Sequence, residues 1–422
     1  MRLVVVKRVS TYTICDLLRL LSGGKLAVRP SRACFDLYYV GVPIFSIGIG
    51  LLISAIIFYT VGVPLDLFIN EIGAGFQSHQ TLRYSVLLLI LGVGLVMSFK
   101  ASVWNVGAEG QMIWGMLAGG FVGLFIASRA IYVSPSELPD YIGVPGVEVL
   151  DASPVKPVIS VLQMNPLLGQ LLMILAAMLA GGLWALIPAF LKAYVGIDEV
   201  ASTLILNYVA YQVFNHLVAY VMRGLSVQAR QFLRTDRLNS ALLFESLPGT
   251  TVTLQEVILS LLFFISMFTL YKYTSIGLRL RVAGSNPQLL RSVGIDERRY
   301  VLIVMLLSGM LAGAAGVSIF ANPGIGKLEK IANVVTPPTF NLGYTAILVS
   351  WLSMLDLRLV PIYAYVVASL FQGGSLLQSE VNARFPGLSL TGAALTYIPI
   401  GSILLVYVVL RVLVDYSVRF RR

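Results

Sequence analysis

The sequence predicts an all-α membrane protein, a polytopic bundle of about ten transmembrane helices. Of the 422 residues, 57% are hydrophobic and only 12% are charged, whereas soluble domains carry about 25% charged residues. The apolar residues occur in long runs that are separated by clusters of basic residues. Such runs are typical of helices that cross a lipid bilayer. A soluble fold is excluded because this composition cannot cover a water-facing surface with polar groups.

Apolar runs of the length that a bilayer requires define ten candidate spans. An N-terminal tail, residues 1–40, and a C-terminal tail, residues 414–422, flank a transmembrane domain over residues 41–413. The expected spans are residues 41–63, 85–99, 112–127, 166–191, 200–221, 257–271, 300–320, 342–355, 359–377 and 395–413. Some of them are short enough to be broken or tilted. Glycines spaced four apart in the third span predict close helix packing at Gly115, Gly119 and Gly123.

Basic residues at the ends of the apolar runs predict the orientation of the chain. Loops rich in Lys and Arg stay in the cytoplasm, and basic residues gather in both tails and in the loop over residues 273–299. An even number of spans places both tails on one side, so the three clusters agree that the N- and C-termini are cytoplasmic. The net charge of +10 is therefore interpreted as a topology signal beside anionic lipid, without a nucleic acid partner.

Residue types that bind metals or catalyse reactions are scarce. The two cysteines, Cys15 and Cys34, and the two histidines form no ligand cluster in the sequence. We therefore expect reduced thiols, no metal and no cofactor. The sequence has no G-x-x-x-x-G-K-[ST] loop for ATP phosphates, and no nucleophile with a matching base stands out. We expect a protein that is not an enzyme and takes its energy from elsewhere.

Two intervals between spans are expected outside the membrane. Residues 128–165 are rich in proline and acidic residues and predict an ordinary capping loop. Residues 222–256 instead carry several arginines, which could dock an acidic partner or could belong to a long loop without such a role. The candidate docking residues are Arg223, Arg230, Arg234 and Arg237.

Polar side chains inside the predicted spans mark a candidate translocation path. Residues 104–111 place a carboxylate and two amides between apolar runs, where a broken backbone needs protein or a water-filled cavity around it. The fifth span carries polar residues every four positions, and a drift of about 40° per step keeps them on one broad helix face. These groups could line a path, cap a helix or bond neighbouring helices. The candidates are Asn105, Glu109, Gln111, Thr203, Asn207, Tyr211 and Asn215.

The basic cytoplasmic loop predicts a short helix between two spans. Asn286 can cap this helix, Pro287 suits its first position, and Gly294 suits a left-handed end. Gly277 and Gly284 are expected to allow tight turns before it. Such a helix could transmit force from a partner into the bundle, and the alternative is a solvated loop with a chance cap. The candidate coupling residues are Arg279, Arg281, Gly284, Asn286, Pro287, Arg291 and Gly294.

Four segments together resemble one family of membrane proteins. They are residues 104–111 (WNVGAEGQ), 196–208 (GIDEVASTLILNY), the 273–295 loop and 308–316 (SGMLAGAAG). In this order they resemble permease subunits of bacterial ABC importers in the branched-chain amino acid, ribose and nucleoside group, especially its nucleoside or simple-sugar branch. After Gly316 the pattern is weaker, because residues 343–351 fit it only in part and the Pro337-Pro338 interval departs from it.

The resemblance implies a permease subunit of an ATP-driven importer in the bacterial inner membrane. The implied partners are two cytoplasmic ATPase subunits, a second permease that is expected to be a paralogue, and an external solute-binding protein. The implied cargo is a nucleoside or a simple sugar, with branched-chain amino acids as a weaker alternative. The ATPases would push on the 286–293 helix and alternate the access of a central cavity.

Two other classes of protein remain as alternatives. An ion-coupled secondary transporter would need carboxylates or histidines within its spans, and only Glu109 is a candidate. That class also leaves the capped cytoplasmic helix without a role. A membrane-embedded enzyme would need a catalytic set that the sequence does not offer.

Overall fold

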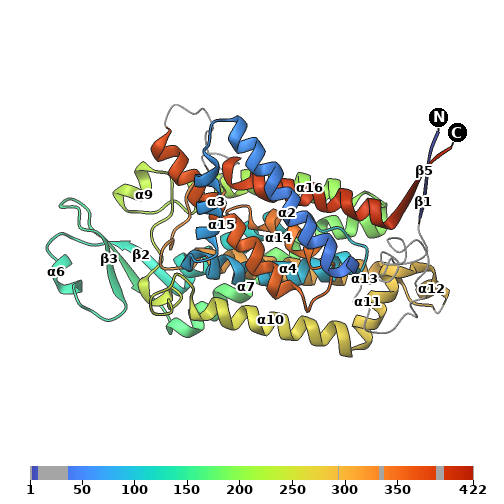
Figure 1. Ribbon diagram of the computed structural model, residues 1–422. Coiled ribbons are helices and arrows are strands. Elements are labelled where there is room, and N and C mark those ends of the chain that lie inside the picture. The colour runs from blue at the N-terminus through green and yellow to red at the C-terminus, as the bar shows by residue number, and fades with distance from the viewer. Residues whose placement is uncertain (1, 8–36, 293, 332–336, 386–393, 422) are drawn as a thin grey trace. The chain divides into compact units, whose positions relative to one another are not determined.

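The computed structural model describes residues 2–7, 37–292, 294–331, 337–385 and 394–421 (Figure 1). Most of the predicted N-terminal tail, including Cys15 and Cys34, lies outside the described residues. The chain divides into two compact units. The first unit comprises residues 1–77, 351–354 and 369–422, and the second comprises residues 78–350 and 355–368.

Eight described helices are long and apolar enough to cross a membrane, which confirms a polytopic helical protein. They are Gly41–Thr60, His79–Lys100, Ala108–Ala127, Pro166–Val195, Leu254–Tyr273, Glu297–Phe320, Val360–Arg384 and Leu395–Val412. Two further predicted spans differ from the expectation. Residues 200–221 are helical but are not among these eight helices, and the helix in residues 342–355 covers only Leu342–Leu352.

The first unit joins the beginning of the chain to its end. Its helices are α2 (Leu37–Thr60), α3 (Leu65–Gly75), the last part of α15 (Val360–Arg384) and α16 (Ala394–Asp415). The short helix α3 was not predicted. The Thr396 hydroxyl donates to Gln378 Oε1 at 2.8 Å and links α16 to α15. Strands β1 (Arg2–Lys7) and β5 (Tyr416–Arg421) pair antiparallel, so the two ends of the chain lie side by side (Figure 1).

Helix α13 (Glu297–Phe320) lies at the centre of the second unit. It packs against α4 (His79–Lys100), α5 (Ala108–Phe121) and α7 (Pro166–Phe190). A Cβ atom on Gly181 of α7 would lie 2.8 Å from the Gly313 Cα, so the two backbones touch. The backbone of Gly115 likewise meets that of Gly313, which confirms close helix packing at this predicted glycine.

Three helices of the second unit continue into π-helical turns. Helix α5 continues into η1 (Val122–Ala127), α7 into η2 (Leu191–Val195), and α8 (Glu199–His216) into η3 (Leu217–Val221). The Asp198 carboxylate caps α8 by accepting from the backbone N–H groups of Val200 and Ala201 at 2.8 and 3.0 Å. The start of α8 is therefore well defined, and this fixes which residues lie on its polar face.

A three-stranded antiparallel sheet covers one end of the second unit. Its strands are β2 (Ser128–Tyr132), β3 (Val147–Asp151) and β4 (Val158–Leu162), in the order β2-β4-β3, and α6 (Leu138–Tyr141) connects β2 to β3. The prediction of an ordinary capping loop over residues 128–165 is therefore wrong. Residues 128–132 pair with residues 158–162, and pairing between distant segments is not visible in local composition.

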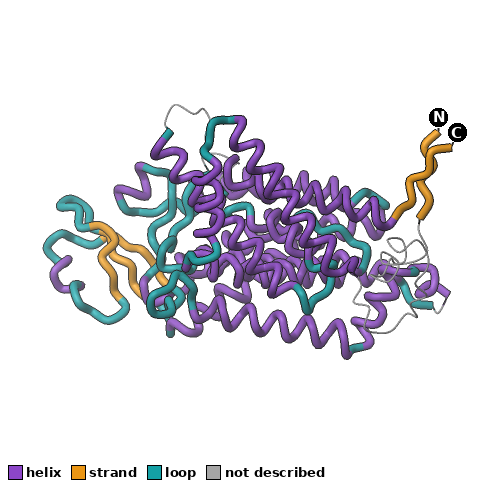
Figure 2. Tube along the Cα trace, in the orientation of Figure 1, coloured by secondary structure: helices purple, strands orange, loops and turns teal. Residues whose placement is uncertain are grey.

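Helices α10 (Leu254–Tyr273), α11 (Ser275–Ser285) and α12 (Pro287–Ser292) lead to the opposite end from the sheet (Figures 1 and 2). Helix α12 is the predicted short helix: the Asn286 side chain accepts from the Leu289 N–H at 3.3 Å, and Gly294 has a left-handed φ of 74°. The predicted turns at Gly277 and Gly284 are wrong, because both glycines lie inside α11. The Thr274 hydroxyl caps α11 before them, and the glycines allow close contact with neighbouring carbonyl groups.

Candidate functional site

Residues 101–107, called the connector, join α4 to α5 and are held by side chains from three helices. Asn105 Nδ2 donates to Gln111 Oε1 of α5 at 3.0 Å and to Ser308 Oγ of α13 at 2.9 Å. Gln111 Nε2 donates back to Asn105 Oδ1 at 2.9 Å. Both amides are buried, and their mutual bonds satisfy groups that would otherwise be costly in the interior.

Asn207 of α8 joins the connector to two further helices. Its Oδ1 atom accepts from the Gly110 N–H of α5 at 2.8 Å. Its Nδ2 atom donates to the Val106 carbonyl of the connector at 3.0 Å and to the Tyr344 hydroxyl at 2.9 Å. Tyr344 belongs to α14 (Leu342–Leu352). One amide side chain thus holds α8, α5, the connector and α14 in register.

Glu109 is fully buried near the start of α5. Its carboxylate accepts from the Thr339 hydroxyl and, at 2.9 Å, from the Gly343 N–H in the first turn of α14. The carboxylate therefore lies between the N-termini of two helices, where helix dipoles favour negative charge. Among the described residues it forms no ion pair.

The backbone before α14 is strained next to this carboxylate. Phe340 and Asn341 adopt left-handed φ values of 55° and 53°. Each such residue costs on the order of 1 kcal/mol and persists only where its surroundings enforce it. The strained residues directly precede the short helix α14, whose first turn donates a hydrogen bond to the Glu109 carboxylate.

The structure brings Asn105, Glu109, Gln111 and Asn207 into one site, and Thr203 and Tyr211 lie on the adjoining buried face of α8. Thr203 donates to the Glu199 carbonyl at 2.6 Å on the buried face of α8, and Tyr211 is 1% exposed on the same face. Asn215 lies apart, where its side chain pairs with the backbone of Ile331 at 2.7 and 3.4 Å. The site, called the polar cluster, consists of Asn105, Glu109, Gln111, Asn207, Ser308, Thr339 and Tyr344.

Three members of the polar cluster were not predicted as site residues. Ser308 lies in residues 308–316, which the sequence singles out only for their resemblance to the permease family. Thr339 and Tyr344 lie in or next to the interval that departs from the family pattern. Single hydroxyl groups show no helical periodicity, so no signal in the sequence selects these three from other serines, threonines and tyrosines.

The polar cluster is closed in this conformation. Asn105, Glu109 and Asn207 are fully buried, and their polar atoms bond one another or the backbone. Two cavities among the described residues lie elsewhere, one near the sheet and one near α11. In the described part of the chain, no group of three or more His, Cys, Asp or Glu side chains could hold a metal ion.

The candidate docking arginines lie at the sheet end, around α9 (Val227–Gln231) and η4 (Ser240–Leu242). Arg234 forms an ion pair with Glu329 at 2.9 Å, and Arg237 donates to the Pro323 carbonyl at 2.9 Å. Arg223 donates to the carbonyl of Arg230, whose own guanidinium donates to the Tyr132 hydroxyl. All four arginines therefore already hold parts of this chain together.

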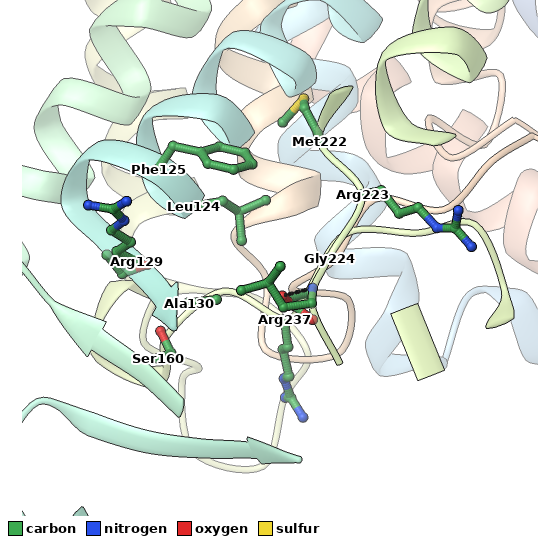
Figure 3. A pocket seen from close by; sticks show the side chains of 12 residues that line it. Leu124, Phe125, Arg129, Ala130, Ser160, Met222, Arg223, Gly224 and Arg237 are labelled. Carbon is green, nitrogen blue, oxygen red and sulfur yellow. Dashed lines mark hydrogen bonds between the residues drawn. The ribbon is translucent and has the colours of Figure 1, made fainter. Parts of the chain in front are cut away.

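A cavity of about 220 Å³ lies beneath β2, between Phe125 and Asp236. Arg129, Arg223 and Arg237 line it, but their guanidinium groups point in different directions (Figure 3). The Asp236 carboxylate accepts from the Leu225 and Ser226 N–H groups at 2.6 and 3.1 Å and is fully engaged. The three arginines therefore do not converge on one anionic ligand.

Two candidate coupling arginines hold α11 against its neighbours. Arg279 donates to the Tyr300 hydroxyl at 3.2 Å, and the Arg281 guanidinium lies 5.1 Å from the centre of the Tyr271 ring. On α12 the apolar side chain of Leu289 is 50% exposed. The side chains of Pro287 and Arg291 lie outside the described part of the structure.

The eight apolar helices define a multi-pass membrane protein, and comparison with known proteins gives its family. The family of the permease component of branched-chain amino acid transport systems matches residues 78–410. The glucose ABC transporter permease protein TsgB13 of Haloferax volcanii is 24% identical over 84% of this chain and 85% of its own length. No solved structure matches the chain.

Two further relatives are nucleoside permeases. The guanosine ABC transporter permease protein NupP of Bacillus subtilis is 26% identical over 69% of this chain and 73% of its own length. The nucleoside ABC transporter permease protein NupB of Lactococcus lactis subsp. cremoris is 22% identical over 65% and 69%, respectively.

The chain belongs to the family of permease components of branched-chain amino acid transport systems, since the match covers most of its length. The predicted class, the permease subunit of an ABC importer, is confirmed. The match also extends to residue 410, well beyond Gly316, where the recognisable sequence pattern weakens.

Proposed function

We propose that the chain forms the translocation path of an ABC importer for a nucleoside or a simple sugar. The observation that carries this proposal is the polar cluster on α5, α8, α13 and α14, buried among membrane helices. Polar groups at such depth are costly and mark functional paths by default. Amides and hydroxyls suit the hydroxyl and ring-nitrogen groups of nucleosides and sugars. Permeases named for glucose, guanosine and nucleosides support this cargo.

In the proposed cycle the polar cluster opens and closes. In the closed state Asn207 bonds Gly110, Val106 and Tyr344. A polar solute that enters the path would replace these hydrogen bonds with its own. The net change in hydrogen-bond free energy would therefore be small. Helix α14 is short and begins at the carboxylate of Glu109, and its movement would release that carboxylate.

The proposed assembly lies in the inner membrane of a bacterium. It contains a second permease, two cytoplasmic ATPases and an external solute-binding protein. Two guanosine permeases of Bacillus subtilis, NupP and NupQ, are 26% and 25% identical to this chain, which supports a paralogous partner. Helix α12 with Leu289 is the proposed ATPase contact, since Arg279 and Arg281 already hold α11. Positive charge at the sheet end supports docking of an acidic binding protein, although its arginines also bond within the chain.

Purification and reconstitution test the proposal. The tagged chain is purified in mild detergent, co-purifying proteins are identified by mass spectrometry, and labelled guanosine and glucose are offered to proteoliposomes. We expect ATPases to co-purify and uptake of one solute to require ATP while tolerating an ionophore. A chain that purifies alone, and whose uptake needs an ion gradient and no ATP, would overturn the proposal and favour a secondary transporter.

One surface variant tests where the ATPase binds. Leu289→Asp places a charge on the exposed face of α12, so we expect the ATPase to be lost from the purified complex. Val144→Asp is the matched control, because Val144 is 41% exposed and lies at the sheet end. Equal ATPase recovery with both variants would contradict a contact through α12.

A further inference from the structure

The connector contacts α11 as well as the polar cluster. The Ser102 hydroxyl donates to the Gly284 carbonyl of α11 at 2.8 Å. A side chain at Gly284 would meet the Lys100 carbonyl, so α11 lies directly on the C-terminal end of α4. Ser102 itself adopts a left-handed φ of 56°. The beginning of the connector is thus strained and bonded to α11, which leads directly into α12, the proposed ATPase contact.

An ion pair lies on the other side of Ser102. Lys192 of η2 donates to the Ser102 carbonyl at 3.0 Å and forms an ion pair with Glu199. Glu199 is the first residue of α8, and the same carboxylate oxygen accepts from the Trp104 N–H of the connector at 3.1 Å. Glu199 is only 6% exposed. One carboxylate thus joins the end of the α7–η2 helix, the connector and the start of α8.

Close packing at this position does not by itself require the charges of Lys192 and Glu199. A largely buried ion pair bears a desolvation cost, and an apolar replacement of similar volume is often as stable. A cavity of about 330 Å³ also lies beside Ser102 and Lys192, between Ala283 of α11 and Tyr300 of α13. The pair therefore lies next to space into which these segments can move.

We propose that Ser102, Lys192 and Glu199 form the joint through which movement of α11 reaches the polar cluster; this inference rests on the proposed function. Movement of α11 would pull Ser102, and Ser102 and Trp104 would carry the ion pair and the start of α8 with them. Asn207 lies about 12 Å from Glu199 along α8, at a rise of about 1.5 Å per residue. Because Asn207 holds Val106 and Gly110, α8 and the connector then move together. Lys192 and Glu199 are positioning residues and touch no solute.

The test measures solute taken up per ATP hydrolysed by the complete transporter in proteoliposomes. The variants are Lys192→Met, Lys192→Arg and Glu199→Gln. The glutamine of Glu199→Gln keeps an acceptor oxygen for the Trp104 N–H. We expect Lys192→Met and Glu199→Gln to lower the ratio about fivefold while ATP hydrolysis continues. Lys192→Arg keeps the charge and should retain most of the ratio. Glu380→Gln is the control, since Glu380 pairs with Arg384 on an exposed face.

Several results would contradict the proposed joint. They are an unchanged ratio in Lys192→Met and Glu199→Gln, an equal loss in Lys192→Arg and Lys192→Met, or a loss that only follows a lowered melting temperature. Failure of the wild-type complex to import any solute with ATP would instead overturn the proposed function itself, so the two failures are distinguishable.

Discussion

At the scale of single residues, Glu109 is the most constrained group in the polar cluster. It is fully buried, and its described partners are a hydroxyl and a backbone N–H at the start of α14. Hydrogen bonds to a charged group contribute about 1.5–3 kcal/mol each, and leaving a buried donor without its acceptor costs about 1–3 kcal/mol. The side chain therefore stabilises the contact between α5 and α14 and also supplies polarity to the proposed path.

Truncation of Glu109 tests this double role. We expect Glu109→Ala to lose about 1–3 kcal/mol of stability, because the Thr339 hydroxyl and the Gly343 N–H lose their acceptor. Glu109→Gln keeps one acceptor oxygen and should lose less. Thermal unfolding in detergent and uptake in proteoliposomes measure the two effects, with the exposed Glu137→Ala as control. A Glu109→Ala protein with wild-type stability and uptake would contradict the role of this carboxylate.

Glu329 shows a different use of a carboxylate, at the sheet end. Hydrogen bonds from Lys327 and then Arg234 hold the pKa of Glu329 below its ordinary value. The ion pairs therefore stabilise the fold above the pKa of the unfolded chain, about 4.3. That contribution is lost as the pH falls through the lower folded-state pKa.

The pH dependence of thermal stability checks this sign. Between about pH 7 and pH 3, the wild type should lose more stability than Glu329→Gln, whose side chain does not titrate. The difference should be small, since the Glu329 side chain is 52% exposed and solvent screens the pair. Parallel curves for the two proteins would show that these ion pairs do not contribute.

At the scale of elements, α11 and α14 are short helices fitted against the ends of longer ones. Helix α11 lies on the C-terminal end of α4 through Gly284, and α14 begins at the carboxylate of Glu109. The buried residues of α11 are only Gly277 and Leu280, so its position depends on a few such contacts, whereas most side chains of α14 are buried. Helix α11 is therefore the better suited of the two to move.

Substitution of Gly284 separates helix propensity from packing. Alanine usually stabilises a helix interior by about 1 kcal/mol relative to glycine. We expect the opposite for Gly284→Ala, because its Cβ would collide with the Lys100 carbonyl. A lower melting temperature and weaker ATP-dependent uptake should follow. The neighbouring, exposed Ser285→Ala is the control, and a stabilised Gly284→Ala protein would refute the close contact.

At the scale of the whole molecule, the chain is one subunit of the proposed assembly. The polar cluster and the proposed joint both lie within the second unit, which also carries α11, α12 and the sheet at opposite ends. Proposed partners on both faces would thus act on the same unit. The first unit contains both ends of the chain, which pair as β1 and β5.

Co-expression of two differently tagged copies tests the proposed paralogous partner. If the second permease is a paralogue, purification through one tag should recover the paralogue and the ATPases but not the second tagged copy. Mass spectrometry and blotting against both tags measure this. Recovery of both tags in similar amounts would show a homodimer and would leave the transport role unchanged.

The sequence by itself determined the class of protein, most of its spans and the short helix at Asn286. These features depend on local composition, on the length of apolar runs and on capping residues, which act within a few positions of the chain. The buried polar face of α8 was likewise predicted, because helical periodicity places Thr203, Asn207 and Tyr211 together.

Only the tertiary structure decided which groups those residues meet. Glu109 meets Thr339 and Gly343 more than two hundred positions away, and Ser102 meets Gly284. The sheet of β2, β3 and β4 also depends on pairing between distant segments. Such contacts arise from the packing of whole helices and strands against one another, and no pattern of neighbouring residues specifies that packing.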